Sequence, residues 1–248
     1  MARIFMFVGV AALALAKMAT ANYRLSDSHD TTNFFDGFEF KNGTGSDGFT
    51  QYVDAETAEA KSLAGIRNGM VYLGVDNTTA NATDGRDSVR VITQNTWSSG
   101  LFIADIAHMP GDECGIWPAY WPNGGETEII EGINLQTTPI ITLHSGENCT
   151  VKNTGSASVS VLTDDDYTQA YGDGFNAVNG GVYAEWTTSA ISVRFFRRSS
   201  IPTDITGGSP EPDTWDTPLT RFVATGCNFS THFTGNDIVF NTNLCGWA

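Results

Sequence analysis

Short apolar runs, separated by turn residues, recur along this chain of 248 residues. Each run is bounded by Gly, Asn, Asp or Pro, and their even spacing is typical of a β-sandwich. A short helical pattern is found at 54–63, and no long segment keeps a helical period with capping residues. We therefore expect an all-β sandwich whose strands lie near residues 70–75, 88–93, 100–107, 115–120, 126–133, 139–143, 181–186, 190–196, 219–224 and 237–240.

Three glutamates within six residues, Glu126, Glu128 and Glu131, follow a turn-forming Pro-Asn-Gly-Gly segment. The residues after this turn are β-branched enough to be extended, so a strand should begin at Glu126. Glu126 and Glu128 would share one face of that strand, whereas strict alternation would turn Glu131 to the other. A β-bulge at Ile129 and Ile130 would return Glu131 to the carboxylate face and direct both isoleucines to the core.

The spacing of these carboxylates bears on the reaction that they could catalyse. About four strand steps at about 3.3 Å each separate the outer α-carbons by roughly 13 Å. Side chains of about 4 Å leave roughly 5 Å between the outer carboxyls, as in retaining glycosidases, whereas inverting enzymes need about 6.5 to 9.5 Å. The alternative is a solvated acidic edge strand, which normally carries basic residues nearby, yet no Lys or Arg stands between Arg90 and Lys152. We favour a nucleophile with an acid/base.

Four aromatic residues lie near this strand in the sequence or in the neighbouring hairpin: Trp97, Trp117, Tyr120 and Trp121. Aromatic rings stack on sugar faces, and their polar groups reach hydroxyls, so all four are candidate substrate contacts. A core position is the alternative, and for Trp117 the two remain equally open. Trp97 and Trp121 adjoin turns, which favours a surface role. His144 follows the carboxylate strand and is either a partner for a carboxylate or substrate, or a structural histidine.

The N-terminus has the pattern of a secretory signal peptide: Arg3, an apolar run over residues 4–16, and a small-residue cleavage site ending at Ala21. The apolar run is shorter than the roughly 20 residues that a membrane helix needs. We expect a secreted protein with one domain over 22–248 and no membrane association. Cleavage removes Arg3 and Lys17 but no acidic residue, so the formal charge of −15 falls to −17. This charge argues against nucleic acid as a partner and is compatible with an uncharged polysaccharide.

The carboxylate strand resembles the E-x-D-x-x-E signature strand of glycoside hydrolase family 16, in its fungal laminarinase-like branch. Similar segments follow in family order at residues 33–36, 85–90, 100–110, 114–119, 142–144, 180–183 and 198–202. The resemblance covers nearly the whole mature chain and implies a concanavalin-like jelly-roll of two curved antiparallel sheets. It assigns Glu126 as nucleophile, Glu131 as general acid/base and Glu128 as the assisting carboxylate.

The chain departs from the family pattern near these residues. The family usually has Asp at the position of Glu128 and an aliphatic residue at that of Thr127. In this chain the hairpin before the carboxylate strand is also several residues shorter than in the family, and we expect the family's closing C-terminal strand to be missing. We expect a monomeric endo-acting hydrolase of β-1,3 or mixed β-1,3/1,4 glucans, with weak activity and without cofactor or metal. A glucan-binding protein that lost the chemistry is the alternative. A metal-binding carboxylate strand is a third reading, and a row without histidine would suit calcium more than a transition metal.

Four cysteines, at positions 114, 149, 227 and 245, allow three full pairings in an oxidising compartment. The family resemblance favours Cys227 with Cys245, because the segment between them resembles a family segment with similar cysteine spacing. Cys114 with Cys149 is less favoured, since three successive antiparallel strands would place these two residues at opposite ends of the meander.

Overall fold

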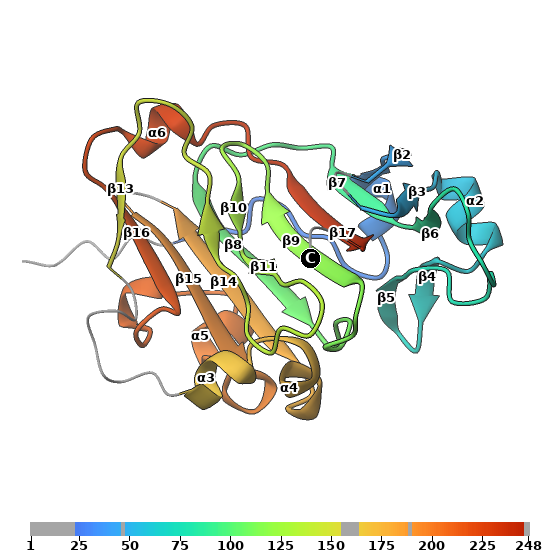
Figure 1. Cartoon of the computed structure of the whole chain (residues 1–248). Coiled ribbons are helices and arrows are strands. Elements are labelled where there is room, and N and C mark those ends of the chain that lie inside the picture. The colour runs from blue at the N-terminus through green and yellow to red at the C-terminus, as the bar shows by residue number, and fades with distance from the viewer. Residues whose placement is uncertain (1–22, 46–47, 155–163, 188–189, 246–248) are drawn as a thin grey trace, which may run out of the picture.

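A pair of five-stranded antiparallel sheets forms the body of the computed structural model, which describes residues 23–45, 48–154, 164–187 and 190–245. The first sheet consists, in spatial order, of β1 (Phe38–Phe40), β7 (Arg90–Thr93), β17 (Ile238–Leu244), β9 (Ile116–Pro122) and β11 (Ile130–Glu131). The second consists of β13 (Val151–Asn153), β16 (Thr220–Ala224), β15 (Ala190–Arg197), β14 (Gly181–Thr187) and β8 (Gly100–Ile106). Figure 1 shows both sheets, and the expected all-β sandwich is confirmed.

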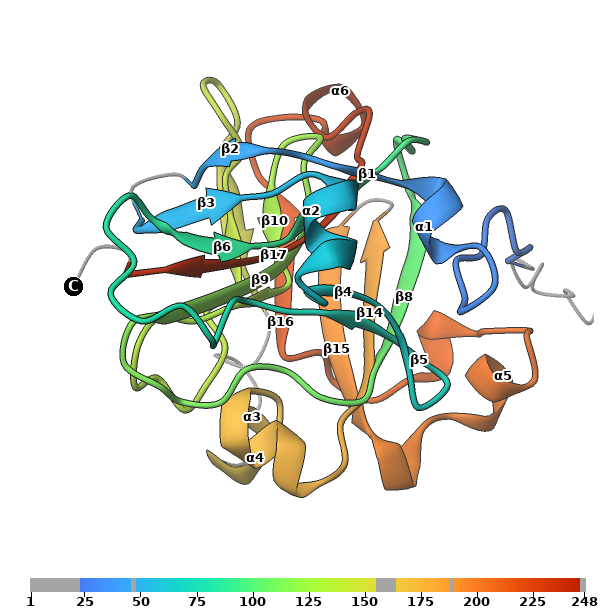
Figure 2. The same ribbon diagram turned by 90° about the vertical axis from the view of Figure 1, so that its right-hand side faces the viewer.

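The core lies between the two sheets. In β9 every second residue from Pro118 onward is buried and the residues between are partly exposed, as expected of a strand with one face toward a core. Tyr120 and Ile130 of the first sheet join Tyr183 and Val193 of the second in one apolar cluster. In Figure 2, β9 and β17 run across the view while β14, β15 and β16 run upright, so the layers cross.

Smaller elements extend the sandwich at its edges. β2 (Gly43–Thr44), β3 (Thr50–Tyr52) and β6 (Arg86–Ser88) form a three-stranded sheet in which β3 and β6 are parallel, and β4 (Ala64–Arg67) pairs with β5 (Met70–Leu73). β10 (Thr127–Glu128) pairs with β12 (Thr142–Leu143). The helices are α1 (Phe34–Gly37), α2 (Ala55–Ala60), α3 (Asp164–Thr168), α4 (Gly172–Ala177), α5 (Thr203–Thr206) and α6 (Phe229–His232), with 3-10 turns η2 (Arg198–Ser200) and η3 (Pro212–Thr214).

The short helix expected at 54–63 is present as α2, and its cap explains where it begins. The carboxylate of Asp54 accepts a hydrogen bond from the main-chain N–H of Thr57 at 2.9 Å, which satisfies one of the free donors of the first turn. The expected signal peptide lies outside the described residues. Within the described part of the chain, no helix has the length and apolarity that a membrane span requires.

The disulfide differs from the expected pairing. Cys149 is bonded to Cys227, while Cys114 and Cys245 are free and exposed. The pairing of Cys227 with Cys245 is therefore wrong. Its physical reason is the topology: β13 and β16 are neighbours in the second sheet, which places Cys149, just before β13, beside Cys227, just after β16. Cys245 follows β17 in the other sheet.

Candidate active site

The first carboxylate stands in the turn rather than in a strand. Glu126 has φ +40°, in the left-handed region that non-glycine residues seldom occupy, and β10 begins only at Thr127. The expectation that the strand starts at Glu126 is therefore wrong at its first residue. Gly125, with φ +118°, lets the chain turn sharply just before it. Backbone strain of this kind often marks functional residues, because the surrounding structure must hold it in place.

The predicted β-bulge is confirmed. Ile130 is the register partner of Tyr120, and the main-chain N–H of Ile129 also donates to the Tyr120 carbonyl, at 3.1 Å. Two residues of one strand thus face one residue of its neighbour, which defines a bulge. Ile129 and Ile130 are 0% and 3% exposed, so both lie in the core, while Glu131 is partly exposed.

Glu128 is the most deeply placed carboxyl of the three. It is 6% exposed, and its Oε2 is buried without a hydrogen-bond partner. Burial, followed by the charges of Glu131 and Glu126 and a hydrogen bond shared with Glu126, raises the pKa of Glu128 to about 9, against the weaker opposing effect of Arg90. At neutral pH Glu128 is therefore a neutral acid that can donate to Glu126.

Glu131 is held by a tryptophan. The indole N–H of Trp117 donates to Oε1 of Glu131 at 3.0 Å. Burial raises the pKa of Glu131, the Trp117 bond and His144 lower it, and the charge of Glu126 raises it again, with a net upward shift. The next residue, Gly132, has no room for a side chain, since a Cβ there would lie 2.4 Å from the ring of Tyr171, which is 1% exposed. A carboxyl with a raised pKa suits proton donation.

His144, the residue after β12, lies beside Glu126. Its main-chain N–H donates to the Glu126 carbonyl at 2.9 Å, and its Nε2 lies 3.6 Å from Oε1 of Glu126. The side chains of His144 and Glu126 are 56% and 40% exposed, so solvent reaches both. His144 was predicted as a candidate carboxylate partner, and the structure places it there.

The aromatic candidates separate into two groups. Trp117 and Trp121 are partly exposed on the face of the first sheet that also bears Glu131, which we call the site face. Trp121 donates from its indole N–H to Asn241 at 2.9 Å. Tyr120 instead points to the core: it is 4% exposed and its ring stacks on Phe240 at 4.6 Å. The expected substrate contact of Tyr120 is corrected, because alternation in β9 turns it away from its neighbours.

Trp97 lies in the loop between β7 and β8. Its backbone forms a bridge with Asn236, and its ring contacts Phe102 edge to face at 6.1 Å. The side chain is partly buried against the main core cluster. Trp97 therefore packs against the core. Among the described residues, no hydrogen bond joins it to Glu126, Glu128 or Glu131.

Sequence reasoning missed Arg90, Asn241 and Tyr52, which form a network of polar contacts around Trp121. Asn241 and Arg90 are register partners in adjacent strands, and the Arg90 guanidinium lies 5.2 Å from the Trp121 ring. Asn241 also donates from Nδ2 to the Tyr52 hydroxyl at 3.1 Å. Because Ala119 is the partner of both Glu131 and Asn241, this network shares the site face. Alternation extended past residue 240 of the last expected strand would have placed Asn241 on it.

A metal ion is sterically possible at the carboxylates. One donor atom each from Glu126, Glu128 and His144 lies within 4.8 Å of the others. The histidine makes this set different from the all-carboxylate row that the sequence suggested, and it would suit a transition metal. The raised pKa of Glu128 opposes metal binding, because a carboxyl must lose its proton to act as a ligand.

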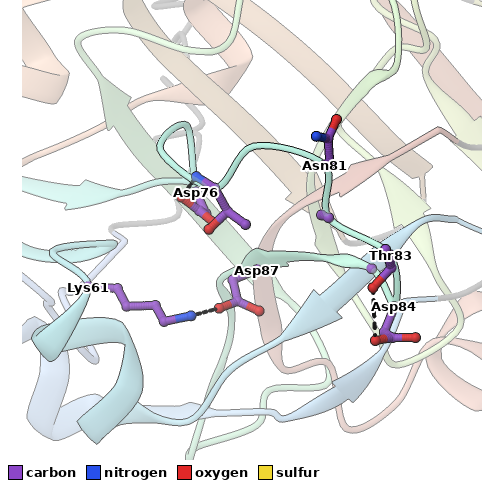
Figure 3. A pocket seen from close by; sticks show the side chains of 9 residues that line it. Lys61, Asp76, Asn81, Thr83, Asp84 and Asp87 are labelled. Carbon is purple, nitrogen blue, oxygen red and sulfur yellow. Dashed lines mark hydrogen bonds and ion pairs between the residues drawn. The ribbon is translucent and has the colours of Figure 1, made fainter.

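A separate surface hollow shares no residue with this site. Lys61, Asp76, Asn81, Thr83, Asp84 and Asp87 are among its lining residues, shown in Figure 3. Lys61 pairs with Asp87, and Asp76 accepts hydrogen bonds from Thr78 and Thr79, which hold its pKa well below the ordinary value. The polar side chains of this hollow thus bind one another and stabilise the loop.

The sequence is similar to those of known glycoside hydrolases. The family model described as XgeA-like, catalytic GH16 domain matches residues 33–248. An endo-1,3(4)-β-glucanase of Arthroderma benhamiae is 37% identical over an alignment of 263 positions, which covers 95% of this chain and 58% of the relative. The endo-1,3(4)-β-glucanase xgeA of Emericella nidulans is 36% identical, with 93% of this chain and 41% of the relative covered. The chain thus spans about half the length of these relatives.

Solved structures agree in fold. Laminarinase 16A from Phanerochaete chrysosporium, solved with β-glucans in donor and acceptor sites, has a TM-score of 0.80 and 34% identity, covering 91% of this chain and 86% of that chain. An elongating GH family 16 β-1,3-glucosyltransferase has a TM-score of 0.79 and 36% identity, covering 90% and 83%. The family match over residues 33–248, together with these structures, shows that the chain belongs to glycoside hydrolase family 16.

Proposed function

We propose that this protein is a secreted, endo-acting hydrolase of β-1,3 or mixed β-1,3/1,4 glucans. Relatives at 36% to 37% identity carry the name endo-1,3(4)-β-glucanase. The observation that carries the proposal is the pairing of two unlike carboxyls across one bulge. Glu131 is partly buried and held by Trp117 with a raised pKa, while Glu126 stands exposed in a strained turn.

The proposed mechanism is double displacement with retention of configuration. Glu126 attacks the anomeric carbon, and Glu131 protonates the leaving oxygen. Glu131 then removes a proton from the water that releases the sugar from Glu126. Trp117 keeps the Glu131 carboxyl in one orientation through its indole N–H, and neutral Glu128 donates to Glu126. Trp121 offers a flat, partly exposed ring on the same face for a sugar unit.

The position of Glu128 favours a second candidate, a glucan-binding protein with impaired turnover. A Glu at the position where the family has Asp brings its carboxyl one methylene closer to Glu126, with which it shares a hydrogen bond. If that bond holds Glu126 away from its line of attack, binding survives while hydrolysis falls.

A reducing-end assay tests the proposal. The protein is expressed with its own N-terminal segment, collected from the medium and incubated with laminarin and with mixed-linkage glucan. New reducing ends, absent from Glu131→Gln protein, support a hydrolase, and the ratio between the substrates indicates linkage preference. If a gel that contains laminarin retards the protein but no reducing ends are released, the glucan-binding protein is favoured. The secreted form should begin near residue 22 and elute as a monomer.

A further inference from the structure

Two free cysteines meet at one end of the sheet that carries the site. Cys114 precedes β9 and Cys245 follows β17, and both are exposed. β9 and β17 are antiparallel neighbours, and their register runs as far as Leu244 opposite Ile116. The start of β9 and the end of β17 therefore adjoin, as Figure 2 shows.

The backbone pairing of the two strands continues beyond their ends, toward the cysteines. The main-chain N–H of Cys245 donates to the Gly115 carbonyl at 2.8 Å, which continues the ladder by one step. A Cβ built on Gly115 would lie 3.3 Å from the sulfur of Cys245. The Cys245 sulfur thus leans over the residue that is bonded directly to Cys114.

Cys114 lies in a turn and Cys245 in a bend, so neither has the conformation of a regular strand. In regular strands Cys114 would point to the face opposite to Gly115. Here Gly115 has φ +80° within a turn closed by a bond from the Ile116 N–H to the Glu113 carbonyl at 3.2 Å, and Cys245 has φ +50°. Opposite α-carbons are about 5.5 Å apart and one step along a strand adds about 3.3 Å, so the diagonal is roughly 6.4 Å. Disulfides span about 4.4 to 6.8 Å between α-carbons.

We propose that Cys114 and Cys245 form a second disulfide when the protein matures in an oxidising compartment, which rests on the proposed secretion. Glutathione disulfide is a sufficient oxidant. One cysteine thiolate attacks it and releases one glutathione, and the second thiolate attacks the resulting mixed disulfide and releases the other. The two protein thiols lose two electrons and two protons, and the glutathione disulfide gains them.

This bond ties together β9 and β17, two neighbouring strands of the sheet that carries the site. β9 carries Trp117 and Trp121, and β17 carries Asn241, which holds Trp121. Because Cys149 is already joined to Cys227, the new bond closes a path of 35 residues from Cys114 to Cys149 and 18 from Cys227 to Cys245, about 53 in all, and such a loop still restricts the unfolded chain. We expect loss of the bond to lower the midpoint of thermal unfolding by on the order of 5 to 10 °C.

Peptide mapping tests the proposal without reference to activity. The full-length protein is equilibrated with glutathione disulfide, denatured, alkylated without reduction, digested and analysed by mass spectrometry. We expect no alkylated thiol and two linked peptide pairs, Cys114 with Cys245 and Cys149 with Cys227. Alkylation of Cys114 and Cys245, or a link between either and another cysteine, overturns it. Since catalysis is not measured, failure here leaves the proposed hydrolysis untouched.

Variants provide the matched control. Cys114→Ser, Cys245→Ser and the double variant all keep Cys149 with Cys227, so any common effect belongs to the second bond. We expect the three to show the same fall in unfolding midpoint, because either substitution removes the same bond. A double variant that unfolds at the wild-type temperature under oxidising conditions would contradict the stabilising role, and the wild-type peptide map decides whether the bond exists.

Discussion

Substitution of Glu128 by aspartate tests whether the longer side chain displaces Glu126 from its reactive position. The substitution withdraws the carboxyl by about 1.5 Å, the length of one carbon–carbon bond. Glu128 shares a hydrogen bond with Glu126, and displacement of a reacting group by about 1 Å can change a rate on the order of a hundredfold. If Glu128 crowds Glu126, Glu128→Asp raises turnover by roughly tenfold to a hundredfold.

The effect on stability is smaller and of the opposite sign. Glu128 is 6% exposed, so removal of its buried methylene lowers the free energy of unfolding by about 1 kcal/mol. Most domains tolerate such a loss, and the rate is therefore expressed per folded molecule, with the folded fraction taken from circular dichroism.

Glu128→Gln is the matched control. Because the pKa of Glu128 is raised to about 9, the side chain is neutral at pH 6, and an amide of equal length has the same charge. We expect reducing-end release by Glu128→Gln to stay within several-fold of the wild type, while Glu128→Asp exceeds it. Lower turnover by correctly folded Glu128→Asp would refute the crowding argument and make the longer acid part of a functional site.

Three further predictions follow from individual contacts. Burial raises the pKa of Glu185 to about 8 from 4.5, so the folded state keeps a proton that the unfolded chain loses, and the free energy of unfolding falls by at most about 5 kcal/mol as pH rises across that range. Chemical denaturation from pH 5 to 8 should show Glu185→Gln becoming more stable relative to the wild type, and equal pH dependence of the two proteins would contradict this. Burial raises the pKa of Glu131 and the hydrogen bond from Trp117 lowers it, so Trp117→Phe should move the alkaline limb of the pH–rate profile to higher pH, because Glu131 then stays protonated longer. An unchanged alkaline limb in folded protein would show that this hydrogen bond does not set the pKa of Glu131. Dialysis against a chelator should leave hydrolysis unchanged, whereas loss restored by one added metal would show that the group around Glu126 and His144 holds a required ion.

Local patterns were enough to predict the carboxylate strand and its bulge. Glu131 could face Glu128 only if the two isoleucines occupied one position of the ladder, and Ile129 donates to Tyr120 as that requires. The turn was harder to delimit, since nothing in the composition tells whether Glu126 ends the turn or begins the strand. Its φ of +40° is a conformation of one residue, which no periodic pattern in the sequence marks.

Contacts between distant segments account for what the sequence did not predict. Asn241 reaches Trp121 because β17 inserts between β7 and β9, a strand order that follows from neither residue. The same applies to Cys149 and Cys227, which meet through the pairing of β13 with β16. Tyr120 is different: alternation along β9 would have placed it in the core once Trp117 was assigned to the site face.

The anomeric configuration of the first product distinguishes double displacement from direct attack by water. Proton NMR during hydrolysis of a β-glucan records the anomer before mutarotation, with Glu126→Gln and Glu131→Gln protein as inactive controls. Attack by Glu126 followed by hydrolysis predicts that the β-anomer forms first. A first-formed α-anomer would contradict double displacement and, with it, the role of Glu126 as nucleophile.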